Sequence, residues 1–257
     1  HPYYKAITSY DGKHIRFCRE FLQMLALSEP HDDVIKLYEA YTVLDTISER
    51  TTTETIASSL SVLSKYDLTP NSYLTVLYET IKSKLQEYLQ ENLASAFTIM
   101  NWLRKAAAIV GDTAATISFN RIVNKAFIES VFNRPQNRET SEFWSSIRTS
   151  EFFDTVATTL TNADILAYYG EKMSKFTCDS WVSFLGIYLV CAQKARKYSE
   201  NELGAVVGRS LYSCYRNKNA NNALQICNLV EKSGHDTIKP LLLKVAESED
   251  PAYTSFC

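Results

Sequence analysis

Histidine and cysteine, the side chains that most often carry nucleophilic or metal chemistry, are sparse in this sequence. The 257 residues include four histidines and six cysteines. A zinc site draws on cysteine or histidine pairs a few residues apart, and no two cysteines form a C-x-x-C pair. We therefore expect no metal site and no cofactor. We expect five cysteines within apolar stretches to be buried thiols that pack as small hydrophobes: Cys18, Cys178, Cys191, Cys214 and Cys227.

Sequence signatures of enzymes are absent as well. The chain contains no G-x-S-x-G, G-x-x-x-x-G-K, H-E-x-x-H or G-x-G-x-x-G. Its carboxylate pairs, at positions 32–33 and 249–250, fall at expected helix ends, where capping explains them. The sequence therefore predicts no catalytic residue, no enzyme activity and no small-molecule substrate.

Charged side chains are more informative, because their signs separate along the chain. The formal net charge is only −2, but residues 29–91 hold eleven acidic residues against five basic ones. Residues 101–138 hold six basic residues against two acidic ones, and residues 172–218 hold eight against three. A basic band in these later segments suits a nucleic-acid backbone. A solvated, lysine-rich face explains the same pattern, and a free-standing RNA-binding protein is usually more basic overall.

Six cations of the first basic segment are our candidate RNA contacts. Two of them stand four residues apart on an expected helix and so share a face, and two more flank Pro135 in a predicted loop over residues 133–142. Contacts of this kind would be to phosphates and therefore tolerant of RNA sequence. The same side chains also suit an acidic protein partner or the acidic segment of a second copy. The candidates are Arg104, Lys105, Arg121, Lys125, Arg134 and Arg138.

The elements that must position these cations are helices. Seven glycines and six prolines are few for a chain of this length, and apolar residues recur at helical spacing. Residues 53–85 predict a helix with the stripe Ala57, Leu60 and Leu63, a turn over 66–70 and a second helix. The second helix carries the stripe Leu74, Leu77, Tyr78, Ile81 and Leu85, and Thr69 before Pro70 is its expected N-cap.

The same stripe recurs along the chain. Ala94, Phe97 and Met100 repeat it 37 residues later, and Ala223, Ile226 and Leu229 repeat it again, followed by Leu241 and Val245. One helical pair cannot bury both of its faces alone, so successive pairs are expected to stack. We predict an all-α fold without a sheet, an α-solenoid of stacked helical hairpins with degenerate repeats of about 37 residues. The alternative is an irregular helical bundle in which the stripes match by chance.

We expect one helical-repeat domain over residues 1–257. Its irregular parts are an N-terminal arm over 1–12, the internal loop over 133–142 and a frayed tail over 248–257. For the helix after the acidic pair at 32–33 we predict a stripe of Ile35, Tyr38, Tyr41, Thr42 and Asp45, flanked by Leu37 and Leu44. Ser199 and Glu202 form an expected capping box at the start of a later helix.

Composition also indicates the cellular compartment and the kind of assembly in which the chain is expected to work. No run of about 18 apolar residues occurs, which predicts no membrane span. Unpaired cysteines in a helical chain indicate a reducing compartment, and a removed targeting peptide stays possible. The chain contains sixteen tyrosines. A tyrosine combines an apolar ring with a hydroxyl that can stay hydrated, and such side chains are common at protein interfaces, so this number favours a subunit of a larger assembly.

Residues 56–74 resemble one unit of the organellar helical-repeat proteins: the FAST-kinase-like and RAP-domain arrays, related in style to octotricopeptide and pentatricopeptide repeats. In this segment a first helix ends near Leu63 and Lys65, a short turn follows, and a second helix opens near Asn71. The resemblance covers about a third of the chain, and no RAP-type domain follows. The base-reading positions of pentatricopeptide repeats are not carried over, because the copies do not keep a constant length.

Such families are found in mitochondria or plastids and bind RNA or belong to mitochondrial ribosomes. The resemblance therefore implies a non-catalytic structural subunit of a large organellar assembly, with a mitochondrial ribosome as the leading expectation, that contacts rRNA and neighbouring proteins. The implied location is the mitochondrial matrix or another organelle, with the cytoplasm as the alternative. The competing function is a protein-only helical scaffold: an accessory subunit of a respiratory or ATP-synthase complex, or a peptide-binding solenoid of the TPR kind.

Overall fold

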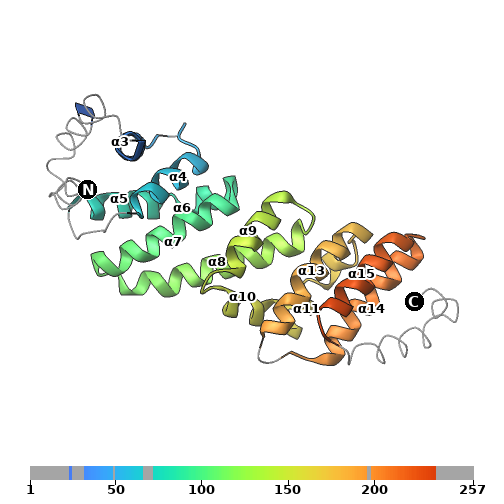
Figure 1. Ribbon diagram of the computed structural model, residues 1–257. Coiled ribbons are helices and arrows are strands. Elements are labelled where there is room, and N and C mark those ends of the chain that lie inside the picture. Colours follow the sequence, from blue (N-terminus) through green and yellow to red (C-terminus); the bar gives the residue numbers. More distant parts are fainter. Residues whose placement is uncertain (1–22, 25–31, 49, 66–71, 196–197, 236–257) are drawn as a thin grey trace. The chain divides into compact units, whose positions relative to one another are not determined.

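A computed structural model describes residues 23–24, 32–48, 50–65, 72–195 and 198–235 (Figure 1). Within these residues the chain is all-helical and contains no strand, which confirms the predicted class. The helices are α3 (Asp32–Asp45), α4 (Thr53–Leu63), α5 (Ser72–Ser83), α6 (Leu85–Glu91), α7 (Leu93–Val110), α8 (Thr113–Asn133), α9 (Arg138–Arg148), α10 (Phe153–Leu160), α11 (Ala163–Tyr168), α12 (Gly170–Met173), α13 (Cys178–Lys194), α14 (Glu200–Arg216) and α15 (Ala220–Lys232).

Short polar side chains define where many of these helices begin. The N-cap side chain accepts a hydrogen bond from a backbone amide two or three residues later, which satisfies one of the unpaired N–H groups of the first turn. At the start of α14, the Ser199 hydroxyl accepts this bond from the amide of Glu202, as the capping-box spacing predicts. Equivalent caps are Thr52, Asn92, Asn137, Asn162, Thr177 and Asn219.

The chain divides into two compact units, His1–Ile122 and Val123–Cys257, where one domain was expected. The boundary falls within α8, so the N-terminal half of this helix belongs to the first unit and its C-terminal half to the second. Each unit is described separately below.

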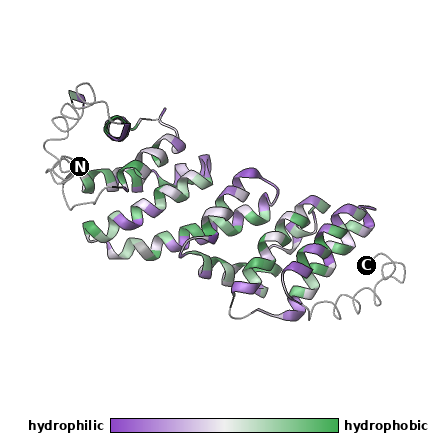
Figure 2. Ribbon diagram, in the orientation of Figure 1, coloured by the Kyte–Doolittle hydropathy of each residue, from purple (hydrophilic) through white to green (hydrophobic). Residues whose placement is uncertain are grey.

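In the first unit, α7 is the central helix and contacts α4, α5 and α6, while α3 packs on α4. Apolar and polar residues alternate along most of its helices (Figure 2). The stripes predicted over residues 53–85 are confirmed, since Leu60, Tyr78 and Ile81 are fully buried. Helix α7 is buried on more than one stripe: Ala96, Phe97, Ile99, Met100, Trp102, Leu103, Ala106 and Ala107.

In the second unit, α13 contacts α10, α14 and α15. Aromatic side chains join α8 to the helices that follow it. Phe127 of α8 lies edge-to-face against Phe143 of α9, with ring centroids 5.6 Å apart, and Phe132 stacks on Tyr169 at 4.2 Å. Phe132 also contacts Phe184 of α13. These rings contribute packing beyond their buried area.

Each later copy of the stripe is buried at its centre and at one end, Met100 or Ala223, and is partly exposed at the other end. Phe97 and Ile226, which match Leu60, are both buried, but Ala94 and Leu229 are partly exposed. Their neighbours Ala96 and Val230 are buried instead. The predicted elements that lie outside the described residues are Leu241 and Val245, the turn with Thr69, the 1–12 arm and the 248–257 tail.

The predicted stripe of α3 is confirmed at Tyr41 but is wrong at its other positions, and the flanking residues Leu37 and Leu44 are buried instead. Its buried residues are Val34, Leu37, Ala40, Tyr41 and Leu44, whereas Asp45 is exposed. A helix buries the face that removes the most apolar surface from water, and α3 packs on α4.

The internal loop is shorter than the predicted 133–142. Helix α8 continues to Asn133 and α9 already begins at Arg138, so the connection is 134–137. Asn137 causes the early start, because its side chain accepts a 2.7 Å hydrogen bond from the amide of Glu139. Pro135 lies buried in this connection.

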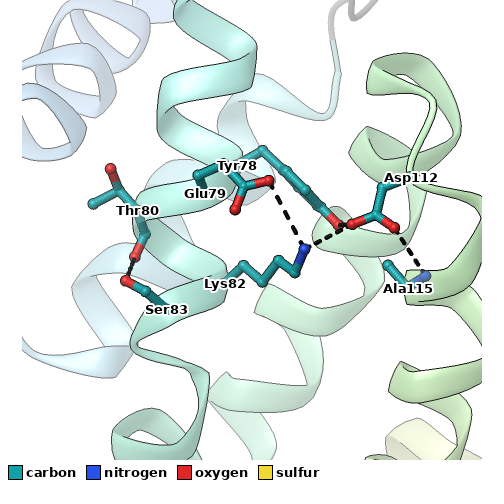
Figure 3. Close-up of polar contacts among 7 residues, drawn as sticks. All are labelled: Tyr78, Glu79, Thr80, Lys82, Ser83, Asp112 and Ala115. Atoms are coloured by element: carbon teal, nitrogen blue, oxygen red, sulfur yellow. Dashed lines mark hydrogen bonds and ion pairs between the residues drawn. The ribbon is translucent and has the colours of Figure 1, made fainter.

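Asp112 ties the start of α8 to α5 (Figure 3). One carboxylate oxygen accepts a 3.1 Å hydrogen bond from the amide of Ala115, and the other accepts from the Tyr78 hydroxyl at 2.8 Å and the Lys82 amine at 2.7 Å. The hydrogen bonds from Lys82 and Tyr78 hold the pKa of Asp112 below its usual value. Burial and the same contact raise the pKa of Tyr78. The cluster thus fixes the helix that carries two of the candidate cations.

Replacing Leu60 with alanine is expected to lower the free energy of unfolding by about 2–5 kcal/mol, because it leaves a cavity between packed helices. Chemical denaturation measures the loss. Ser58→Ala, on the exposed side of α4, is the matched control and should change stability by less than about 0.5 kcal/mol. A Leu60→Ala protein as stable as the control would contradict the packing of α4.

Asp112→Asn is expected to lower the melting temperature at neutral pH, and the deficit should shrink on acidification. The folded pKa of Asp112 is depressed, so its stabilisation is present above the unfolded pKa and is lost as the pH falls through the folded pKa. Melting curves across the acid range test this. Asp164→Asn, at an exposed position in α11, is the control; an Asp112→Asn deficit that does not vary with pH would rule out the charged contact.

Candidate nucleic-acid interface

The six candidate cations are divided between the two units. Arg104 and Lys105 of α7 and Arg121 of α8 belong to the first. The second unit holds Lys125 of α8, Arg134 in the α8–α9 connection, and Arg138 at the first position of α9. The structure therefore presents the candidates as two groups, one on each unit.

In the first unit the candidates differ in access to solvent. Lys105 and Arg121 are exposed, but Arg104 is half-buried. Burial lowers the pKa of Arg104, although a guanidinium stays charged at any physiological pH. Arg104 is thus the least accessible of the six for an external phosphate.

In the second unit all three candidates are exposed. The Lys125 amine lies 3.9 Å from a carboxylate oxygen of Glu129, and Arg138 Nε lies 2.7 Å from Glu142 Oε1. The hydrogen bond to Glu142 raises the pKa of Arg138. Both pairs span one helical turn, and the side chains of Lys125 and Arg138 are 76% and 90% exposed. Ion pairs in such positions contribute little to stability, so a phosphate can compete for these cations.

The spacing predicted for Arg121 and Lys125 is confirmed, because both lie in the continuous helix α8, four residues apart. The prediction that Arg134 and Arg138 share a loop is wrong for Arg138, which is helical. Its backbone is held by the α9 N-terminus, so only its side chain can adapt to a ligand.

The second basic segment, residues 172–218, contains cations that the candidate set omitted. Three of its lysines are occupied: Lys172 donates to Asn133, Lys175 to Glu171, and Lys194 lies 3.0 Å from Asp154. Two arginines on α14, Arg209 and Arg216, are exposed instead. In the sequence, the only signal for these two arginines was the excess of basic over acidic residues in segment 172–218.

Metal-binding side chains do not gather into a candidate metal site in the described part of the chain. No group of three or more histidine, cysteine or acidic residues there is placed to hold a metal ion. Cys178, Cys191 and Cys214 are buried, and burial raises the pKa of the Cys191 and Cys214 thiols to about 12. Cys227 is exposed, contrary to the prediction, and Cys18 lies outside the described residues.

Among the helices of the described ranges, none combines the length and apolar character that crossing a bilayer requires. Known proteins offer no guide to this chain: no family model, no curated protein and no solved structure matches it. Its function must therefore be argued from the charges and geometry of its own side chains.

Neutralising the three cations of the second unit should leave the fold intact. The triple variant Lys125→Gln, Arg134→Gln and Arg138→Gln loses only exposed, local ion pairs. Its circular dichroism spectrum and melting temperature are expected to match those of the wild-type protein. A clear drop in melting temperature would mean that these side chains serve the structure, and would remove them as contacts available to a ligand.

Proposed function

We propose that this chain is a non-catalytic helical-repeat subunit of a large organellar assembly and contacts RNA through the α8–α9 cations. The observation that carries the proposal is the exposure of Lys125, Arg134 and Arg138 at the C-terminal half of α8 and the start of α9. Two of these cations have only weak local partners, and the described residues offer no ion pair to Arg134.

The repeat architecture is part of the proposal. It is supported by the number of residues that separate hydrogen-bond partners along the sequence. In a stack of repeats each unit touches only its neighbours, so contacts join residues about one repeat apart. Thr53 donates to Glu91 and Asn92 donates to Glu54, both across 38 residues. In the second unit, Gln136 donates to Thr177 across 41 residues, and Tyr198 and His235 hydrogen-bond across 37. These separations favour degenerate repeats close to the expected 37 residues within each unit.

Phosphate contact is the interaction that these cations suit best. Arginine presents a planar fork of donors that matches phosphate oxygens, and the exposed side chains are free to follow a backbone. The formal net charge of −2 weakens non-specific binding of free RNA. A local basic surface on a chain of balanced charge fits a subunit held in place by protein neighbours as well as by RNA.

The organellar setting is the part of the proposal that rests on the sequence resemblance described for residues 56–74, and not on the charges and contacts of the structure. The proposed location is the mitochondrial matrix or another organelle, and the proposed assembly is a mitochondrial ribosome, in which the chain contacts rRNA and neighbouring subunits. No small-molecule substrate enters this proposal.

A protein-only scaffold is the second candidate, such as an accessory subunit of a respiratory or ATP-synthase complex, or a TPR-like peptide-binding array. Large apolar side chains on the surface favour it. Val76 of α5 and Ile117 of α8 are 64% and 68% exposed in the first unit. Contacts with other proteins would cover such side chains.

Isolation of the native assembly under RNA cross-linking conditions separates the two candidates. The tagged wild-type chain should bring down rRNA, and the triple variant Lys125→Gln, Arg134→Gln and Arg138→Gln should assemble but cross-link less. The matched control is Lys36→Gln, Arg50→Gln and Lys65→Gln, exposed cations of the acidic segment with the same change in charge. An assembly free of RNA supports the scaffold; undiminished cross-linking of the triple variant excludes α8–α9 as the contact.

Salt dependence gives a quantitative prediction for the purified full-length chain. Each phosphate contact on a single strand contributes roughly 0.7 to the slope of log K against log salt concentration, so losing three contacts should reduce the slope by roughly 2. Fluorescence anisotropy with a labelled oligouridylate measures it. A triple variant that binds with the wild-type slope would show that its cations do not touch phosphate.

A further inference from the structure

Helix α14 presents one exposed ridge to solvent. Its other faces are buried between α13 and α15, with Leu203, Val207 and Leu211 among the buried residues. Exposed and half-exposed positions that follow one another at helical spacing along the remaining face are Asn201, Ala205, Arg209, Tyr212, Ser213 and Arg216. Glu200, Glu202 and Tyr215 are the other positions of the helix that are not buried.

The C-terminal half of this ridge is positive. Residues 203–230 include Arg209, Arg216 and Lys218 and no acidic residue. Across the part of the chain that the structure describes, neither arginine has an ion pair. The acidic residue beside this end of α14 is Asp179 of α13, which accepts a 2.6 Å hydrogen bond from Asn222. These arginines thus lack the carboxylates that lie beside Lys125 and Arg138.

Helix stability explains only part of this arrangement. Arg216 lies in the last turn, where a cation stabilises the negative end of the helix dipole. Arg209 lies two turns earlier, beyond the reach of that effect. An exposed arginine in the middle of a helix, without an ion pair among the described residues, leaves room for an external anion.

An aromatic ring lies between the two arginines. Tyr212 is half-exposed, three residues after Arg209 and four before Arg216, so all three side chains share one face. The Arg216 guanidinium lies 6.0 Å from the centroid of the Tyr212 ring, and Tyr215 packs near the same ring at 6.4 Å. These neighbours hold the half-exposed ring in place.

We propose that this ridge of α14 binds single-stranded RNA, with Arg209 and Arg216 on phosphates and Tyr212 against a base. Seven residues of helix separate the arginines by about 10 Å along the axis, so they reach different phosphates of one strand. Cations that follow a backbone beside an aromatic platform are the combination by which proteins bind single strands without reading their sequence. The inference rests on the RNA association proposed above and adds a contact apart from α8–α9.

Binding of a labelled oligouridylate to the full-length chain tests the phosphate contacts. Arg209→Gln with Arg216→Gln should weaken binding and reduce the salt slope by roughly 1.4, the share of two phosphates on a single strand. Arg209→Lys with Arg216→Lys keeps the charge and should restore most of the slope. Lys36→Gln with Arg50→Gln is the control of equal charge change and should leave the slope as it is.

The ring contact has a separate readout. Photo-cross-linking of an oligomer containing 5-iodouridine should label the tryptic peptide 210–216, which holds Tyr212. Tyr212→Phe should keep wild-type affinity because its ring still stacks, whereas Tyr212→Leu should bind more weakly. Labelling of other peptides alone, or equal binding by the Phe and Leu variants, would overturn the base contact.

The outcomes separate the inference from the function on which it rests. If the wild-type chain neither binds the oligomer nor brings down RNA in its assembly, the proposed RNA association fails. If the chain binds RNA, and the α8–α9 triple variant weakens binding while the α14 variants do not, the RNA association stands and the inference about α14 is wrong. Circular dichroism of each variant confirms that the helices remain folded.

Discussion

Burial of apolar stripes between sequential helices is the interaction on which this structure depends. Helix α7 shows it most clearly, because it contacts α4, α5 and α6 and buries residues around much of its circumference. Leu60, Ile81 and Leu103 lose all contact with solvent in this way. The apolar surface removed from water is what offsets the conformational entropy of ordering each helix.

Polar contacts then set the register between neighbouring helices. Asp112 caps α8 and accepts from Tyr78 and Lys82, so the end of one helical pair is linked to the preceding helix. Glu91 does the same for the start of α4 by accepting from the amide and hydroxyl of Thr53. Such bonds are individually modest, but a buried or partly buried polar group left without its partner is costly. They select one arrangement among the many that apolar packing alone would allow.

Since the apolar faces are used for packing, the charged side chains lie on the ridges that remain. Some cations there pair with nearby carboxylates, as Lys175 does with Glu171. The two surfaces proposed to meet RNA differ from each other in this respect: α8–α9 carries pairs that span one turn and exchange readily, and α14 carries arginines without such pairs.

The sequence by itself determined the helical class, because scarce glycine and proline and a 3.6-residue apolar period act locally. It also indicated Leu60, Tyr78 and Ile226 as positions on apolar stripes, and Ser199 as a cap, because a stripe and a cap are both defined by residues within a turn or two. Only the tertiary structure decided which stripe of α3 is buried, that Cys227 is exposed, and that α9 begins at Arg138. It alone showed that Lys125 and Arg138 have carboxylate partners while Arg209 and Arg216 lack them. The physical reason is that burial and pairing depend on which neighbour a face meets, and helical periodicity specifies the face but not the neighbour.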